Sequence, residues 1–121
     1  MDPRKNKGNR GEAVVAEYLR KKKYTILEEQ FRTRRGEIDI VARSPEGILC
    51  FVEVKTREDA SFAAAREFVT LAKQRRLRAA AQYYLVVYGE GDALCRFDVA
   101  EVYMKTGLFS RPEINYIEQA F

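Results

Sequence analysis

Histidine is absent from this sequence of 121 residues. Its absence excludes Ser–His–Asp and Cys–His catalytic groups, zinc sites with histidine ligands and histidine-based phosphodiesterases. Cysteine is scarce as well, because only Cys50 and Cys95 occur, each within an apolar stretch typical of a strand. Two buried, reduced thiols are the expected state of this pair. Catalysis by this chain would therefore depend on carboxylates, lysine, tyrosine or a bound metal.

Long apolar runs are also lacking. No run approaches the roughly 20 residues that a membrane-spanning helix needs. The basic N-terminal segment MDPRKNKGNR is not followed by an apolar stretch, so it does not resemble a secretory signal. We therefore expect a cytoplasmic protein with no membrane association. The formal net charge of +4 permits a nucleic-acid partner without requiring one.

The hydrophobic pattern predicts a single domain over residues 8–121, preceded by a flexible basic arm over residues 1–7. Helical periodicity covers residues 8–23 and 70–87. Strand-like patterns cover residues 24–31, 36–43, 48–56, 94–103 and 113–119, with a turn at residues 44–47 and a loop at residues 57–66. The order α-β-β-β-α-β-β predicts an α/β fold with one mixed sheet flanked by helices.

The hairpin over residues 36–56 carries the residues of greatest chemical interest. Because side chains alternate along a strand, Glu37, Asp39 and Val41 are expected on one face, and Ile38 and Ile40 on the other. In the second strand, the alternation places Glu53 and Lys55 together. If residue 44 pairs with residue 48, Asp39 lies directly opposite Glu53, and their side chains point to the same side. A shift of one residue in register would separate them.

Two carboxylates held this close repel each other, and a divalent cation relieves the repulsion. Mg²⁺ binds a few carboxylate oxygens, keeps several waters and then accepts phosphate oxygens, which is typical of metal-dependent phosphodiesterases. A lysine two residues after the second acid can orient or deprotonate the attacking water, or neutralise the phosphorane. The alternative is a solvated face with a ladder of ion pairs. The apolar surroundings, IDIVA and ILCFVEV, favour the functional interpretation because charges in buried strands are costly unless they are paired or metal-bound.

Both predicted helices offer a polar residue at the N-terminal end of an apolar stripe. Glu12 shares its stripe with Val15 and Leu19, and is either a third metal-binding carboxylate or a glutamate that complements the helix dipole. Lys73 precedes Leu77 by one turn, and its side chain either extends along the apolar surface to solvent or points at a phosphate, the interpretation that we favour. Arg75, Arg76 and Arg78 mostly face elsewhere. Further phosphate contacts are expected from arginines that flank the acids in sequence, chiefly Arg10, Arg35 and Arg57, although each of them taken alone is better interpreted as a solvated charge.

The motifs of this chain resemble those of a known family. The succession GNRGEA-x-x-A-x-Y-L, RGEIDIVA, FVEVKTR, K-x-x-R-L-x-x-A-A and RFDVAEV resembles the YraN-like family of small bacterial proteins. That family is similar to archaeal Holliday-junction resolvases and other PD-(D/E)XK nucleases. The resemblance covers roughly residues 8 to 119, and the pair GEIDIVA and FVEVKTR is its most specific part.

The resemblance implies roles for individual residues. Asp39 corresponds to the aspartate of the nuclease motif, Glu53 to its second acid and Lys55 to its lysine. The backbone carbonyl of Val54 would be a further metal ligand, and Glu12 matches a helix glutamate found in resolvase-like members.

The same resemblance implies a restriction-endonuclease-like fold, dependence on Mg²⁺ or Mn²⁺, and cleavage that leaves 5′-phosphate ends. The expected partner is nucleic acid, above all branched or structured DNA, and by analogy with junction-cutting members a homodimer is one expected assembly. The alternatives are a non-catalytic nucleic-acid-binding or accessory protein, and a structural adaptor whose charged hairpin is only a surface.

Overall fold

The computed structural model describes residues 3–57, 69–104 and 111–121, with side chains from residue 10 onward. Its helices are α1 (Pro3–Lys21) and α2 (Leu71–Val87), and its strands are β1 (Thr25–Arg32), β2 (Glu37–Arg43), β3 (Leu49–Arg57), β4 (Cys95–Tyr103) and β5 (Glu113–Ile117). The order α-β-β-β-α-β-β is the predicted one.

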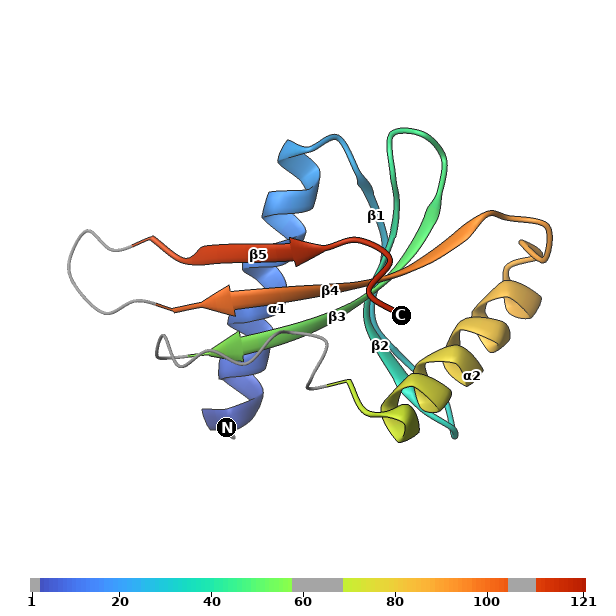
Figure 1. Cartoon of the computed structure of the whole chain (residues 1–121), viewed down its shortest axis with the longest axis horizontal. Helices are drawn as coiled ribbons and strands as arrows, with labels where there is room; N and C mark the ends of the chain where they lie inside the picture. Colours follow the sequence, from blue (N-terminus) through green and yellow to red (C-terminus); the bar gives the residue numbers. More distant parts are fainter. Residues whose placement is uncertain (1–2, 58–68, 105–110) are drawn as a thin grey trace.

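The five strands form one sheet in the order β1-β2-β3-β4-β5. The β3–β4 pair is parallel and the other pairs are antiparallel. The parallel pair requires a crossover, which α2 supplies between β3 and β4. Figure 1 shows α1 and α2 on opposite sides of the sheet. This three-layer α/β arrangement with a mixed sheet is consistent with the predicted restriction-endonuclease-like fold.

Two hydrophobic clusters fasten the helices to the sheet. Val15, Ala16 and Leu19 of α1 pack against one sheet face, which includes Ile40 and Val52. On the other face, the buried stripe of α2 packs against the sheet and consists, as predicted, of Leu77, Ala80, Ala81 and Tyr84. β2 and β3 are therefore covered on both faces, which explains their nearly continuous apolar sequences.

Most element boundaries lie within one or two residues of those predicted. The 44–47 turn is confirmed, because the Ser44 N–H donates to the Ile48 carbonyl at 2.8 Å and the Gly47 N–H donates to the Ser44 carbonyl at 2.9 Å. Gly47 has a φ of 91°, a conformation that glycine adopts without strain. Thr70 caps α2, since its side chain accepts the Lys73 N–H at 3.2 Å.

Two expectations need correction. α1 begins at Pro3, so residues 3–7 belong to the helix and not to an arm preceding it. Cys50 and Cys95 are both free, but Cys95, the first residue of β4, is exposed and not buried as expected. The predicted loop at residues 57–66 lies almost wholly outside the described residues, as do residues 1 and 2. In the part of the chain that is described, neither helix is long and apolar enough to cross a membrane.

Candidate functional site

The candidate site lies where β2 and β3 part from each other. Their pairing runs from Arg43↔Leu49 to Ile40↔Val52, which is the predicted register. In an antiparallel ladder, every second pair of opposite residues is hydrogen-bonded. Because Ser44 is bonded to Ile48, this pattern predicts that the Val54 N–H donates to the carbonyl of the opposite residue, Ile38. It donates instead to the Asp39 carboxylate, at 2.8 Å. The side chain of Asp39 thus replaces a strand carbonyl at the point of separation.

A second irregularity lies directly across β2 from this point. The β1–β2 pairs Glu29↔Ile40 and Phe31↔Ile38 place Gln30 opposite Asp39. Gln30 has a φ of 52°, which is uncommon for a residue other than glycine and marks local strain. This conformation lets the Gln30 amide donate to the Glu12 carboxylate of α1 at 3.1 Å.

The irregularity also changes which sheet face the neighbouring residues occupy. Phe31 packs toward α2, with its ring 5.2 Å from that of Tyr84. Ile38 joins the cluster beneath α2, whereas Ile40 joins the cluster beneath α1. The expectation that Ile38 and Ile40 share a face is therefore wrong, because regular alternation stops at Asp39.

Asp39 and Glu53 form a closely coupled pair of acids. Asp39 is only 8% exposed. Burial, and then the negative charge of Glu53, raise the pKa of Asp39 to about 7. Burial also raises the pKa of Glu53, although Lys55, with its Nζ 3.7 Å from the Glu53 Oε1, opposes that rise. The pair favours a shared proton or a bound cation over two bare negative charges.

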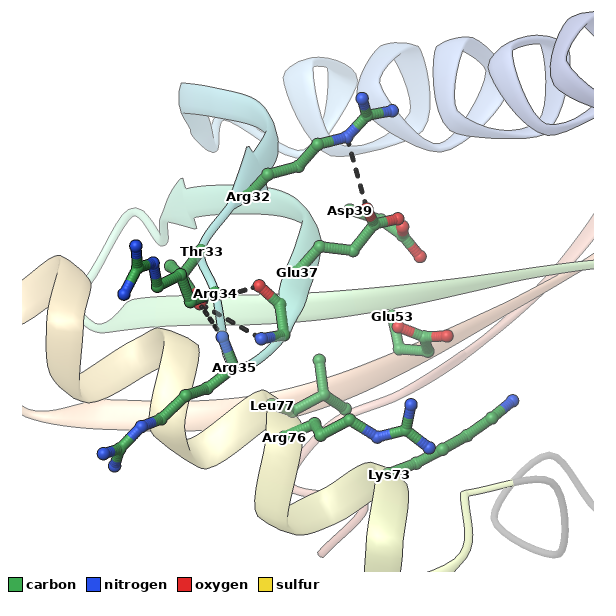
Figure 2. Close-up of a pocket in the computed structure, with 11 residues that line it drawn as sticks. Arg32, Thr33, Arg34, Arg35, Glu37, Asp39, Glu53, Lys73, Arg76 and Leu77 are labelled. Carbon is green, nitrogen blue, oxygen red and sulfur yellow. Dashed lines mark hydrogen bonds and ion pairs between the residues drawn. The ribbon is translucent and has the colours of Figure 1, made fainter.

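Basic residues of α2 face these acids across a pocket of about 460 Å³. Lys73 and Arg76 extend from α2 toward the side on which Glu53 lies, with Leu77 between them and the β1–β2 turn (Figure 2). The pKa of Lys73 is lowered, first by the close approach of Lys55 and then by burial. Lys73 thus lies on the side of α2 that faces the hairpin acids, as predicted. Arg76 also lines the pocket, although helical periodicity predicted that it faces elsewhere.

Glu12 lies beside the pair without lining the same pocket. Its carboxylate borders a separate hollow with Glu29 and Gln30. Burial, and then the charge of Asp39, raise the pKa of Glu12 to about 7. Among the described residues, no three acidic, cysteine or histidine side chains gather closely enough to hold a metal by themselves. The charge of Asp39 thus acts on Glu12 in this geometry. The role of Glu12 as a metal ligand stays a prediction, as does that of the Val54 carbonyl.

The arginines predicted to bind phosphate fall into different places. Arg35 lines the pocket from the β1–β2 turn, and Arg10 is exposed on α1. Arg57 is mostly buried, and its Nε lies 3.3 Å from the Glu101 carboxylate.

The sequence did not predict the part that Gln30 plays, because nothing in the sequence around it indicates a left-handed backbone. Arg76 could have been found, since it follows Lys73 by three residues and so lies near it on the helix.

Comparisons with known proteins agree on one family. The family model described as "Uncharacterised protein family UPF0102" matches residues 11–102, a range that holds Glu12, Asp39, Glu53, Lys55 and Lys73. A UPF0102 protein of Acetivibrio thermocellus is 44% identical over 117 residues, which cover 94% of this chain and 89% of that protein. One from Caldicellulosiruptor saccharolyticus is 41% identical over 94% of this chain and 95% of its own length. Another from Symbiobacterium thermophilum is 43% identical over 94% of each chain. The chain therefore belongs to family UPF0102, which is the YraN-like family that its motifs resemble.

Proposed function

We propose that this protein is a metal-dependent endonuclease that hydrolyses phosphodiester bonds of DNA, above all in branched or structured DNA. The observation that carries the proposal is the pair Asp39 and Glu53, held at the point where β2 and β3 separate. The Val54 N–H fixes Asp39 with a 2.8 Å hydrogen bond, and Lys55 forms a looser ion pair with Glu53, so both carboxylates have a partner before a ligand arrives.

The residues of the site fit a divalent cation. The raised pKa values of Asp39 and Glu53 show that negative charge at this position is under-compensated within the protein. Two carboxylates with open space beside them suit Mg²⁺ or Mn²⁺, which retain waters and accept substrate phosphate oxygens. When bound, such an ion would neutralise the pair, polarise the phosphate and favour a hydroxide-like attacking water.

The chain's own residues would divide the remaining tasks. Lys73 and Arg76 would hold the phosphate backbone on the α2 side of the pocket. Lys55, anchored on Glu53, would orient the attacking water or neutralise charge on the phosphorane. Water oxygen would then bond to phosphorus while the bond to the 3′-oxygen breaks. The products would be a 5′-phosphate and a 3′-hydroxyl, the latter formed as the leaving oxygen takes up a proton.

The direct test is cleavage of linear, nicked and four-way-junction DNA in the presence of Mg²⁺ or Mn²⁺. We expect the wild type to cut at least one substrate, and Asp39→Ala and Glu53→Gln to lose about 100-fold or more of that rate. Glu46→Gln is a matched control, because Glu46 is an exposed acid in the 44–47 turn and should leave the rate unchanged. Retention of cutting by Asp39→Ala would overturn the assignment.

Calorimetric titration with Mn²⁺ tests the metal separately from the chemistry. We expect Glu53→Gln to weaken Mn²⁺ binding, whereas Glu46→Gln should not. If the wild type binds DNA but cuts no substrate with either metal, the protein is a non-catalytic nucleic-acid-binding member of the fold. If Mn²⁺ binding is absent or unaffected by Glu53→Gln, the carboxylate pair is not a metal site.

A further inference from the structure

A second and larger hollow adjoins the acidic pocket. Its volume is about 920 Å³, and the β1–β2 turn, Arg32–Arg35, forms a wall that the two pockets share. Its far side is made by Tyr83 and Val86 of α2 and by Gly91. Arg34 and Arg35 point away from Asp39 and Glu53, toward the other side of the turn (Figure 2). One continuous surface thus leads from the acids, over the turn, to the outer face of α2.

Positive charge is concentrated along this surface. The turn contributes Arg32, Arg34 and Arg35 to the second hollow, and α2 contributes Lys73 and Arg76 to the acidic pocket. Arg32 is paired with Glu37, with its Nε 3.3 Å from that carboxylate. Arg75 and Arg78 of α2 lie elsewhere, in a pocket with Phe51 and Phe97. None of the described residues that line the second hollow is acidic. A polyanion would be drawn to this side of the molecule.

The far wall of the hollow is apolar and open to solvent. Tyr83 is 56% exposed and Val86 is 80% exposed, although both belong to a regular helix. The Tyr83 ring lies 6.1 Å from the Phe31 ring, which supports it from beneath. An aromatic ring that is supported on one side and free on the other offers a face on which a base can stack.

The shared wall is held in place by its own contacts. The Thr33 side chain donates to the Gly36 carbonyl at 2.9 Å and accepts the N–H groups of Arg35 and Gly36, each at 3.1 Å. The turn also packs closely on α2, because a Cβ on Gly36 would lie 2.5 Å from the Arg76 carbonyl oxygen. The arginines therefore project from a backbone that is fixed before any ligand binds.

We propose that this hollow binds a single-stranded segment of nucleic acid that flanks the scissile phosphate, with a base stacked on Tyr83 and phosphates bound by Arg34 and Arg35. The proposal rests on the proposed function, since it places the cut strand in the acidic pocket. Bases inside a duplex are already stacked and cannot reach the Tyr83 ring, so the hollow selects unpaired nucleotides. A second copy of this chain is a poorer occupant, because a two-fold interface formed by this hollow would bring both copies of these arginines into one contact surface.

The absence of tryptophan from the chain provides a local reporter of binding. Tyr83→Trp would place the only indole in the hollow, and Leu94→Trp would place one at a site that is 76% exposed and outside it. Each variant is titrated in EDTA with an oligothymidylate and, separately, with a blunt duplex. We expect the single strand to quench the indole at position 83 and not at position 94, and the duplex to quench neither. Tyr83→Ala should weaken binding of the single strand by about 5- to 150-fold.

The two arginines are tested through salt dependence. Replacing Arg34 and Arg35 by glutamine should lower the slope of log K against log salt by about 0.7 for each phosphate that these side chains neutralise. The matched control replaces Arg20 and Lys21, the basic pair at the end of α1, and should leave the binding constant and slope nearly unchanged.

Other outcomes overturn the proposal. Equal quenching at positions 83 and 94, or single-strand binding with no quenching at either, would show that the base does not stack there. Concentration-dependent dimerisation that Val86→Lys abolishes, with no effect of Tyr83→Ala on DNA, would identify a second copy as the occupant. Because quenching is measured without catalysis, it separates the two proposals. Quenching at position 83 without cleavage of any substrate would refute the proposed nuclease activity and support the single-strand site. Cleavage without quenching would refute the single-strand site and support the nuclease activity.

Discussion

The Asp39 carboxylate should destabilise the metal-free protein at neutral and alkaline pH. Its pKa is raised from 3.8 to about 7, so the folded protein retains a proton that the unfolded chain releases. Where the folded state binds more protons, stability falls as the pH rises, here between about pH 4 and pH 7. A shift of about three units at 1.36 kcal/mol each sets a ceiling near 4 kcal/mol for the cost of ionised Asp39.

Asp39→Asn removes this cost while keeping the local hydrogen bond. The amide oxygen can accept the Val54 N–H as the carboxylate does, and the volume of the side chain barely changes. We expect the variant to be more stable than the wild type by about 2–4 kcal/mol at pH 8, and by about 2 kcal/mol or less at pH 5, where Asp39 already holds its proton. Urea unfolding in EDTA, followed by circular dichroism at both pH values, measures the difference. Glu46→Gln, at an exposed position, should change neither value.

The metal supplies the complementary measurement. Mn²⁺ should raise the unfolding free energy of the wild type at pH 8, because a ligand that binds only the folded state stabilises it. The same concentration should stabilise Asp39→Asn much less. The reasoning fails if Asp39→Asn is no more stable than the wild type at pH 8, or if its gain is as large at pH 5 as at pH 8.

Two further predictions concern the frame around the site. Gly36→Ala would place a methyl group 2.5 Å from the Arg76 carbonyl oxygen, so it should cost about 1–3 kcal/mol of stability and weaken DNA binding. Gly91→Ala, which would meet no heavy atom within 4 Å, is its control for stability alone, and equal effects of the two in urea unfolding would contradict the contact. Asp98→Ala should cost about 3–5 kcal/mol, because it removes the buried acceptor that the Arg96 Nε and the Tyr116 hydroxyl share. Thermal unfolding measures the stability of Asp98→Ala, with Asp92→Ala at an exposed site as the control. A loss of stability no larger than that of the control would show that Asp98 does not stabilise the fold through these contacts.

The parts of the site that the sequence predicted depend on one short turn. Ser44 to Gly47 sets the hairpin register, and with it the pairing of Ile40 with Val52. Once that register is set, period-two alternation brings Asp39 close to Glu53 without further information. Lys73 was predicted on the same grounds from helical periodicity, which places it one turn before Leu77.

What the sequence did not predict depends on departures from regular geometry. Glutamine has no particular preference for a left-handed backbone, so the φ of 52° at Gln30 could not be foreseen. That conformation takes the Gln30 side chain to α1, and the assumption of regular alternation then fails for Ile38. The burial of Arg57 against Glu101 could not be predicted from the sequence either, because it depends on the parallel pairing of β3 with β4.

A comparison of two buried aspartates, Asp39 in β2 and Asp98 in β4, supports the proposal that the carboxylate pair is a site and not part of the core. Asp98 is fully buried, but its oxygens accept from the Arg96 guanidinium at 2.9 Å, from the Tyr116 hydroxyl at 2.6 Å and from the Gln119 N–H at 2.9 Å. Such an acid is compensated inside the protein and fastens the C-terminal segment to β4. Asp39 is nearly as buried, yet it accepts one backbone N–H, lies beside a second acid and opens into a pocket. The fold neutralises the aspartate in β4 and leaves the one in β2 with fewer partners, and this contrast supports the proposed binding of a cation beside Asp39.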